Sequence, residues 1–187
     1  MDALKQEKIY TIKDIYELPD GKRAELIDGK IYYMAPPSWK HQRISGYLYN
    51  EIYNYIKENK GGCEVLAAPF AVFLSEDDIN YVEPDLSVIC DQSKLDEKGC
   101  HGAPDWIIEI VSPGNPGHDY IRKLNLYADA GVREYWIVDP RTKQVLIYYL
   151  EQTDFQMGTY TFQDKIKANI YDDLYIDFSD IARLLVQ

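Results

Sequence analysis

Two acidic side chains and one lysine in the middle of the chain have the types and spacing of a metal-dependent nuclease site. Asp85 follows Pro84 at the start of an apolar run, Glu109 interrupts the apolar run 106–111, and Lys123 follows on a predicted helix. A carboxylate in an apolar run loses its hydration, which is costly unless a partner compensates for it. Glu109 therefore requires a basic residue, a proton, or a cation shared with a second carboxylate, for which Asp85 is the candidate.

Hydrolysis of a phosphodiester bond is the reaction that these side chains suit. It needs a hard cation to neutralise developing charge, a water activated nearby, and often a fixed ammonium group. On adjacent strands, Asp85 and Glu109 would converge on one Mg²⁺, for which Mn²⁺ would substitute, with the carbonyl of Ile110 as a further ligand. Lys123 would supply the ammonium group. A simpler interpretation stays open, in which Asp85 caps a turn, Glu109 pairs with an arginine and Lys123 is a solvated charge.

The helices and strands that must position these side chains are predicted from hydrophobic periodicity and turn residues. Asp28-Gly29 is a strong hairpin signal, and Gly131 ends the helix that carries Lys123. The predicted helices are 11–18, 38–60 and 117–130, the strands are 23–27, 30–34, 64–74, 85–90, 106–111, 134–138, 144–150 and 158–162, a polar loop covers 91–104, and Ser179 caps a short C-terminal helix. This order predicts an α/β (mixed α+β) fold with a central mixed β-sheet flanked by helices.

Length and composition predict one globular domain. At 187 residues the chain can bury a substantial core, and its 46% apolar and 27% charged residues are ordinary for a globular protein. We expect a single domain over 1–187, with a core at about 9–150 and a C-terminal strand and short helix at 151–187. No apolar run approaches the roughly 20 residues of a membrane span, so we expect no membrane partner.

The first residues and the cysteines indicate where the protein works. Residues 1–8 are charged and lack the apolar stretch of a secretory signal, which predicts a cytoplasmic protein. Cys63, Cys90 and Cys100 are odd in number and form no C-x-x-C pair. We therefore expect reduced thiols rather than a disulfide framework or a zinc site.

The net charge of the chain limits the ways in which it can bind nucleic acid. A charge of −11 argues against a protein that coats nucleic acid, because such binding depends on neutralising phosphates with Lys and Arg. It does not exclude a nuclease, since basic residues can still cluster locally, as at Lys22 and Arg23 or within 40–43.

Several motifs resemble those of the Uma-two family, a family of endonuclease-like proteins in the PD-(D/E)xK superfamily. In chain order they are 23–29 (RAELIDG), 41–44 (HQRI), 84–86 (PDL), 102–113 (GAPDWIIEIVSP), 123–127 (KLxxY) and 131–140 (GVREYWIVDP). The resemblance covers about 9–150 and is more specific than any single motif. It implies a restriction-endonuclease-like core, dependence on magnesium and a nucleic-acid substrate, with DNA as the expected one.

The superfamily motif carries over to this sequence with one departure. Asp85 matches its first acidic residue and Glu109 its second, but Val111 stands where the lysine is expected. The resemblance implies that the lysine has migrated to the following helix, as Lys123. Because a valine cannot stabilise charge, Val111 leaves open whether the site is active. Asp105 repeats the Pro-Asp motif, but along a strand it would lie about 13 Å from Glu109, so we favour Asp85.

Glu25 and His41 match further recurrent residues of the resembled family. Glu25 would hold a second cation or orient a water, and a neutral His41 would transfer a proton near neutral pH. Without the resemblance, a solvent-facing or salt-bridged Glu25 and a histidine packed against a loop would be the simpler interpretations.

These observations predict a cytoplasmic, Mg²⁺-dependent endodeoxyribonuclease. A homodimer is expected because two sites can address two strands, and Tyr49 and Tyr53, which lie off the apolar stripe of the long helix, are candidates for its interface. The alternative is a catalytically silent nuclease-fold module that binds nucleic acid or a protein, which the acidic charge and Val111 favour. A glycosidase that uses the two carboxylates as acid and base is a third possibility, and it would require an open sugar cleft between them.

Overall fold

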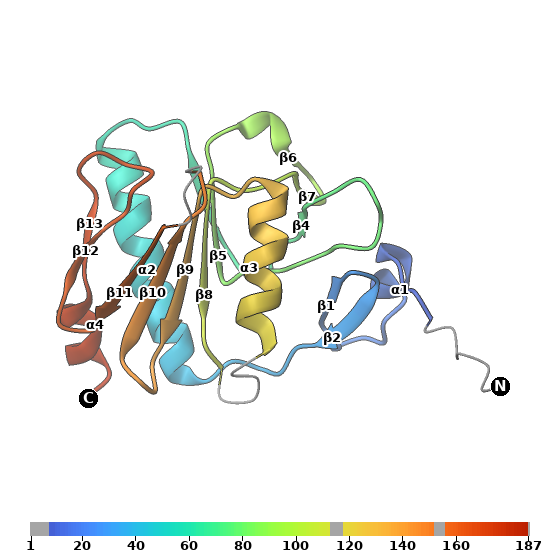
Figure 1. Ribbon diagram of the computed structural model, residues 1–187, viewed down its shortest axis with the longest axis horizontal. Coiled ribbons are helices and arrows are strands. Elements are labelled where there is room, and N and C mark those ends of the chain that lie inside the picture. The colour runs from blue at the N-terminus through green and yellow to red at the C-terminus, as the bar shows by residue number, and fades with distance from the viewer. Residues whose placement is uncertain (1–7, 113–117, 152–155, 187) are drawn as a thin grey trace.

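The structure is a computed structural model that describes residues 8–112, 118–151 and 156–186, apart from the side chains of 118–120 (Figure 1). Its first half contains α1 (Ile12–Tyr16), β1 (Ala24–Ile27), β2 (Lys30–Tyr33), α2 (Trp39–Glu58), β3 (Glu64–Ala67), β4 (Val72–Phe73) and β5 (Leu86–Ile89). The second half contains η1 (Gln92–Lys94), β6 (Leu95–Asp96), β7 (Gly99–His101), β8 (Trp106–Ile110), α3 (His118–Ala130), β9 (Glu134–Asp139), β10 (Gln144–Tyr149), β11 (Gln156–Thr161), β12 (Lys165–Lys167), β13 (Tyr175–Asp177) and α4 (Phe178–Leu184).

A six-stranded mixed sheet forms the centre of the fold. Its strand order is β11-β10-β9-β8-β5-β3, in which β8 and β9 are parallel and the other neighbours are antiparallel. The central strands β8 and β9 are almost fully buried, which explains why their sequences are nearly continuous in apolar residues. The predicted mixed sheet flanked by helices is confirmed.

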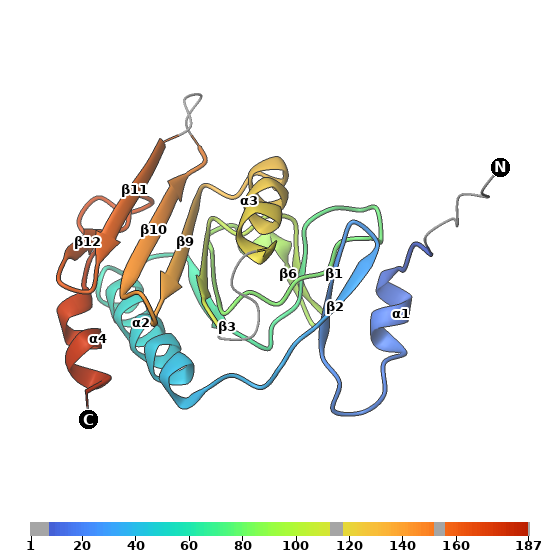
Figure 2. The same ribbon diagram turned by 60° about the horizontal axis from the view of Figure 1, so that its bottom comes forward.

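The two faces of this sheet are covered by different helices (Figures 1 and 2). Alternate residues of β8 point to opposite faces. Trp106 and Ile108 belong to the cluster that contains the apolar stripe of α2, whereas Ile107 and Val111 belong to the cluster that contains residues of α3. Glu109 has the parity of Ile107 and Val111, so its side chain lies on the face that α3 covers.

Some parts of the fold differ from the sequence prediction. The strand predicted at 64–74 is divided into β3 and β4, because Pro69 has no N–H group with which to continue the ladder. The loop predicted at 91–104 contains η1, β6 and β7, and these two strands form a small sheet with β4. The hairpin β12–β13 was not predicted. Asp177, rather than Ser179, caps α4, since its side chain accepts a hydrogen bond from the Ser179 N–H.

Cys63 and Cys90 form a disulfide, so the expectation of reduced thiols is wrong for this pair. The cause is the register of β3 on β5, in which Glu64 lies opposite Ile89 and the next residues outward face each other. Cys100 is a buried free thiol. Cysteine usage therefore no longer supports a cytoplasmic location. Among the described helices, none is long and apolar enough to cross a membrane.

Candidate active site

The pairing of two strands places Asp85 and Glu109 next to each other at one end of the sheet. β5 and β8 are antiparallel with Leu86 opposite Ile108, so Asp85, the residue before β5, lies across from Glu109. The two side chains keep only 16% and 13% of their surface exposed. The adjacency expected from the sequence is thus a consequence of strand register.

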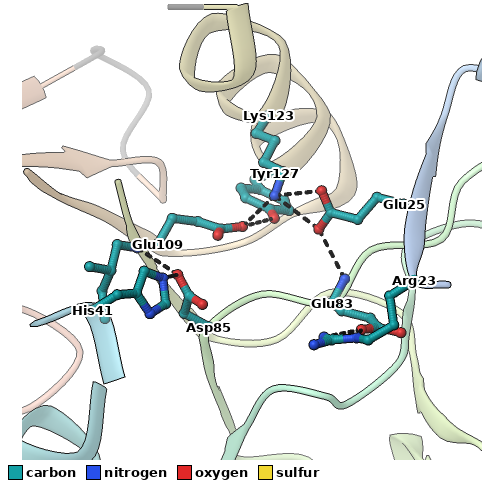
Figure 3. A network of polar contacts seen from close by, with 9 residues as sticks. Arg23, Glu25, His41, Glu83, Asp85, Glu109, Lys123 and Tyr127 are labelled. Carbon is teal, nitrogen blue, oxygen red and sulfur yellow. Dashed lines mark hydrogen bonds and ion pairs between the residues drawn. The ribbon is translucent and has the colours of Figure 1, made fainter. Parts of the chain in front are cut away.

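Lys123 reaches these carboxylates from α3, and its ammonium group lies between Glu109 and Glu25 (Figure 3). Nζ is 2.8 Å from Oε1 of Glu109 and 2.8 Å from Oε2 of Glu25. The lysine and Glu25 side chains are 8% and 7% exposed, so this ion triad is almost fully removed from solvent. Of the compensators expected for the buried Glu109, a basic residue is the one that the structure provides, and it is a lysine rather than an arginine.

Tyr127 is a further member of the site to which the sequence analysis assigned no role. It lies one helical turn after Lys123 and is fully buried, and its hydroxyl donates a hydrogen bond of 2.8 Å to Oε1 of Glu109. Two donors therefore hold the same oxygen. The four-residue spacing, which puts both side chains on one face of α3, was the available signal.

Asp85 is held from two directions at the start of β5. Its Oδ2 accepts a hydrogen bond of 2.7 Å from the backbone N–H of Ile110 and lies 3.1 Å from Nε2 of His41. His41 is placed by the start of α2, where the side chain of the N-cap Ser38 accepts a hydrogen bond from its N–H. In Figure 3 the second oxygen of Asp85 carries no marked contact.

Burial and neighbouring charge alter the proton affinities of this cluster. Burial raises the pKa of Glu109 to about 7, although Lys123 opposes the shift, and the charges of Glu25 and Asp85 raise it further. Burial alone would lower the pKa of Lys123, but the two carboxylates outweigh it and hold that pKa above its usual value. Burial likewise lowers the pKa of His41, but Asp85 more than offsets it, and the pKa is raised.

A second layer of contacts fixes Glu25. Its Oε1 accepts a hydrogen bond of 3.1 Å from the backbone N–H of Glu83. The Glu83 carboxylate in turn pairs with the Arg23 guanidinium and accepts a hydrogen bond of 2.7 Å from the Tyr81 hydroxyl. In addition, Leu26 of β1 forms an antiparallel β-bridge with Tyr81. The strand that carries Glu25 is therefore tied to the segment that leads into Asp85.

The carboxylates face a cavity of about 460 Å³. Its wall includes the charged residues of the site, the last residue of β8, Ile110, and most of the segment 32–37. The structure thus brings every candidate residue to one cavity, namely Glu25, His41, Asp85, Glu109, Ile110 and Lys123. Asp105 lies apart from it, where it accepts a hydrogen bond from the Cys90 N–H and pairs with Arg133.

Asp85 and Glu109 are the candidates for binding a hard divalent cation. In the described part of the chain, no group of three or more His, Cys, Asp and Glu side chains is arranged to hold a metal ion. Asp85 and Glu109 each engage one oxygen with protein donors and have a second oxygen without a marked contact in Figure 3. Carboxylate and backbone oxygens are the ligands that Mg²⁺ and Mn²⁺ prefer. Glu25 suits a cation less well, because its oxygens already contact Lys123 and Glu83.

Comparisons with known proteins identify the family and the fold. The model of the Uma2 family, described as "Putative restriction endonuclease", matches residues 12–176. An uncharacterised protein of Synechocystis sp. is 26% identical over 154 residues, which are 81% of this chain and 80% of that protein. A crystal structure from Anabaena variabilis, described as "a putative nuclease belonging to DUF820", has a TM-score of 0.76 and 22% identity, and it covers 94% of this chain and 98% of its own. This last likeness shows that the fold is shared.

Proposed function

Because this chain belongs to the Uma2 family of restriction-endonuclease-like proteins, we propose that it is a metal-dependent endonuclease that hydrolyses phosphodiester bonds in nucleic acid. The observation that carries the proposal is the meeting of Asp85, Glu109 and Lys123, from three separate elements, at one cavity. Val111 stands where the motif has its lysine. The site nevertheless contains an ammonium group, because that of Lys123 lies within hydrogen-bond distance of Glu109.

The roles of the residues follow from their contacts. A divalent cation held by Asp85, Glu109 and the Ile110 carbonyl would neutralise charge on the phosphate and lower the pKa of a nearby water. Lys123 remains charged and stabilises the additional negative charge of the pentavalent transition state. Glu25 keeps the ammonium in place through its direct ion pair, rather than holding a second cation.

His41 and Tyr127 orient the two carboxylates. His41 fixes one oxygen of Asp85 through its Nε2, 3.1 Å away, and so acts as a positioning residue. Tyr127 fixes one oxygen of Glu109 through a buried hydrogen bond. Each carboxylate thereby presents a defined second oxygen toward the cavity.

The proposal extends to Mg²⁺ as the metal, DNA as the substrate, products with a 5′ phosphate, and a homodimer whose two sites address two strands.

Two tyrosines of α2 are the candidates for the dimer interface. Tyr49 and Tyr53 stack with ring centroids 5.9 Å apart, and Tyr53 is 44% exposed, which supports an interface there. Sedimentation equilibrium of the wild type and of Tyr53→Glu would test the dimer, because a buried charge at the interface favours the monomer.

The second candidate is a catalytically silent module that keeps the fold and binds nucleic acid or a protein. The net charge of −11 and the presence of Val111 favour it. The position of Asp85, Glu109 and Lys123 around one cavity, rather than in a closed core, favours the active enzyme. The family and the shared fold support a nuclease over a glycosidase.

The test is cleavage of single- and double-stranded DNA in the presence of Mg²⁺ or Mn²⁺. Wild type should cut, chelation should stop cutting, and Asp85→Ala and Glu109→Ala should each abolish it. Asp105→Asn is the matched control, because it changes the other Pro-Asp motif outside the cavity and retains an acceptor for the Cys90 N–H. A folded wild type that cuts neither substrate with either metal would favour the silent module.

A further inference from the structure

Two large aromatic side chains are exposed at the two ends of the connection between β2 and α2, beside the cavity. Tyr33 is 67% exposed and Trp39 is 56% exposed. Single exposed aromatic residues are common, but these two belong to one continuous stretch that borders the site. Tyr33 itself lines the cavity, and Trp39 lies two residues before His41, whose ring contacts Asp85.

The same stretch carries exposed cations in a strongly acidic chain. Lys40 and Arg43 are both exposed in the first turns of α2, and the ammonium of Lys40 lies 5.7 Å from the centre of the Trp39 ring. Figure 2 shows the connection as an extended run from the β1–β2 hairpin to the start of α2. Two exposed aromatic residues and two exposed cations therefore lie in one stretch, 33–43, of which Tyr33, Pro37 and His41 line the cavity.

This combination suits an unpaired nucleic-acid strand. Proteins that bind single strands place bases on aromatic side chains and track the backbone with Lys and Arg. A duplex stacks its bases internally and is bound chiefly by many phosphate contacts, which a chain of net charge −11 is poorly equipped to make. Inside the cavity, Arg23 is paired with Glu83 and the proposed function gives Lys123 the scissile phosphate, so the exposed Lys40 and Arg43 are the cations left for the neighbouring phosphates of the strand.

We propose that the 33–43 segment binds unpaired nucleotides, with bases stacked on Tyr33 and Trp39 and phosphates contacting Lys40 and Arg43, and so guides a single strand across the cavity. The inference rests on the proposed function for what then happens at the carboxylates. The binding itself needs no cleavage, so the two ideas can fail separately.

The distribution of tryptophans provides a direct probe. Trp106 and Trp136 are 0% exposed, so a change in tryptophan fluorescence on binding reports Trp39. The probes are oligothymidine and oligouridine of about 12 nucleotides, together with a DNA duplex of the same length, titrated in EDTA so that the strands stay intact. Affinities for the dye-labelled forms of the same probes are measured by fluorescence anisotropy.

The variants are Trp39→Ala, Tyr33→Ala and, as a matched control, Tyr175→Ala. Tyr175 is 48% exposed and also lies near a lysine, with the Lys165 ammonium 5.5 Å from its ring centre, but it belongs to β13 and not to the cavity wall. All three changes are at exposed positions, and circular dichroism checks that each variant is folded.

We expect single strands to quench Trp39 and to bind more tightly than the duplex. Trp39→Ala and Tyr33→Ala should each weaken single-strand binding by about fivefold or more, with no change in Tyr175→Ala. The oligothymidine and oligouridine titrations decide between DNA and RNA.

The proposal is overturned if the tryptophan signal does not respond, if the two variants bind as wild type does, or if the duplex binds more tightly. Metal-dependent cutting that is unaffected by Trp39→Ala would support the proposed nuclease activity and refute the binding role of the 33–43 segment. Stacking on Trp39 without cutting under any metal would support the binding role and refute the nuclease activity.

Discussion

Replacement of Lys123 by methionine should destabilise the protein, and by an amount that depends on pH. The ammonium is 2.8 Å from both Glu25 and Glu109, and all three side chains are at least 87% buried. Methionine keeps the length and apolar stem of the side chain but leaves two like charges without compensation. Breaking a buried pair in this way typically costs about 3–5 kcal/mol, which for a chain of this size lowers Tm by about 6–20 °C.

The pH dependence follows from the pKa of Glu109. Burial already raises that pKa, and Lys123 lowers it, so its loss in Lys123→Met raises it further. A carboxyl group whose pKa is raised by folding contributes stability that is present below its unfolded pKa and is lost as pH rises through the folded pKa. The loss of stability relative to wild type should therefore be smaller at about pH 5, where only Glu25 lacks its counterion, than at about pH 8.5, where both carboxylates do.

Urea unfolding at both pH values measures this effect. Lys13→Met is the matched control, because Lys13 also forms an ion pair, with Glu17, but both side chains are largely exposed and the pair should contribute little. The double variant Glu25→Gln/Lys123→Met should recover part of the loss, since it removes one uncompensated charge. A destabilisation equal at both pH values, or no larger than that of Lys13→Met, would refute the reasoning.

Three further predictions concern other contacts. Tyr127→Phe removes one hydrogen bond to Glu109 and should lower kcat about tenfold or more while oligonucleotide affinity is unchanged, as steady-state kinetics and anisotropy would show. Burial raises the pKa of Glu134 to about 7, so its contribution to stability is lost as pH rises through that value. Glu134→Gln should therefore make the urea midpoint depend less on pH between about pH 5 and 8.5. Reduction of the Cys63–Cys90 disulfide opens a link between residues 27 apart and should cost about 3–4 kcal/mol, measured by unfolding with and without reductant.

The predicted elements that agree with the structure had long periodic signals or distinctive turns. The stripe of α2 and the Asp28-Gly29 hairpin are examples, because each is determined by residues close in sequence. Strands β4 and β6 have only two residues each, which is too short for any period to appear. The Cys63–Cys90 pair depends on the register of β3 against β5, which no local pattern encodes.

The candidate site shows the same division. The apolar context of Glu109 indicated that it needs a partner but not which one, because the ion pair with Lys123 depends on how α3 packs against the sheet. A salt-bridged Glu25 was one of the interpretations left open, but its partner could not be predicted, since the ion pair with Lys123 depends on how the hairpin docks. Tyr127 was missed because a tyrosine on the buried face of a helix is usually only a core residue.

The pairing of Glu25 with Lys123 joins residues 98 positions apart. Contacts so distant in sequence require much of the intervening chain to be ordered first, and they form slowly because a large loop must close. The first hairpin can fold early by local pairing, yet its glutamate has no counterion until β5, β8 and α3 have assembled. A chain in which these elements have not yet docked accordingly has the individual side chains of the site but not the assembled site.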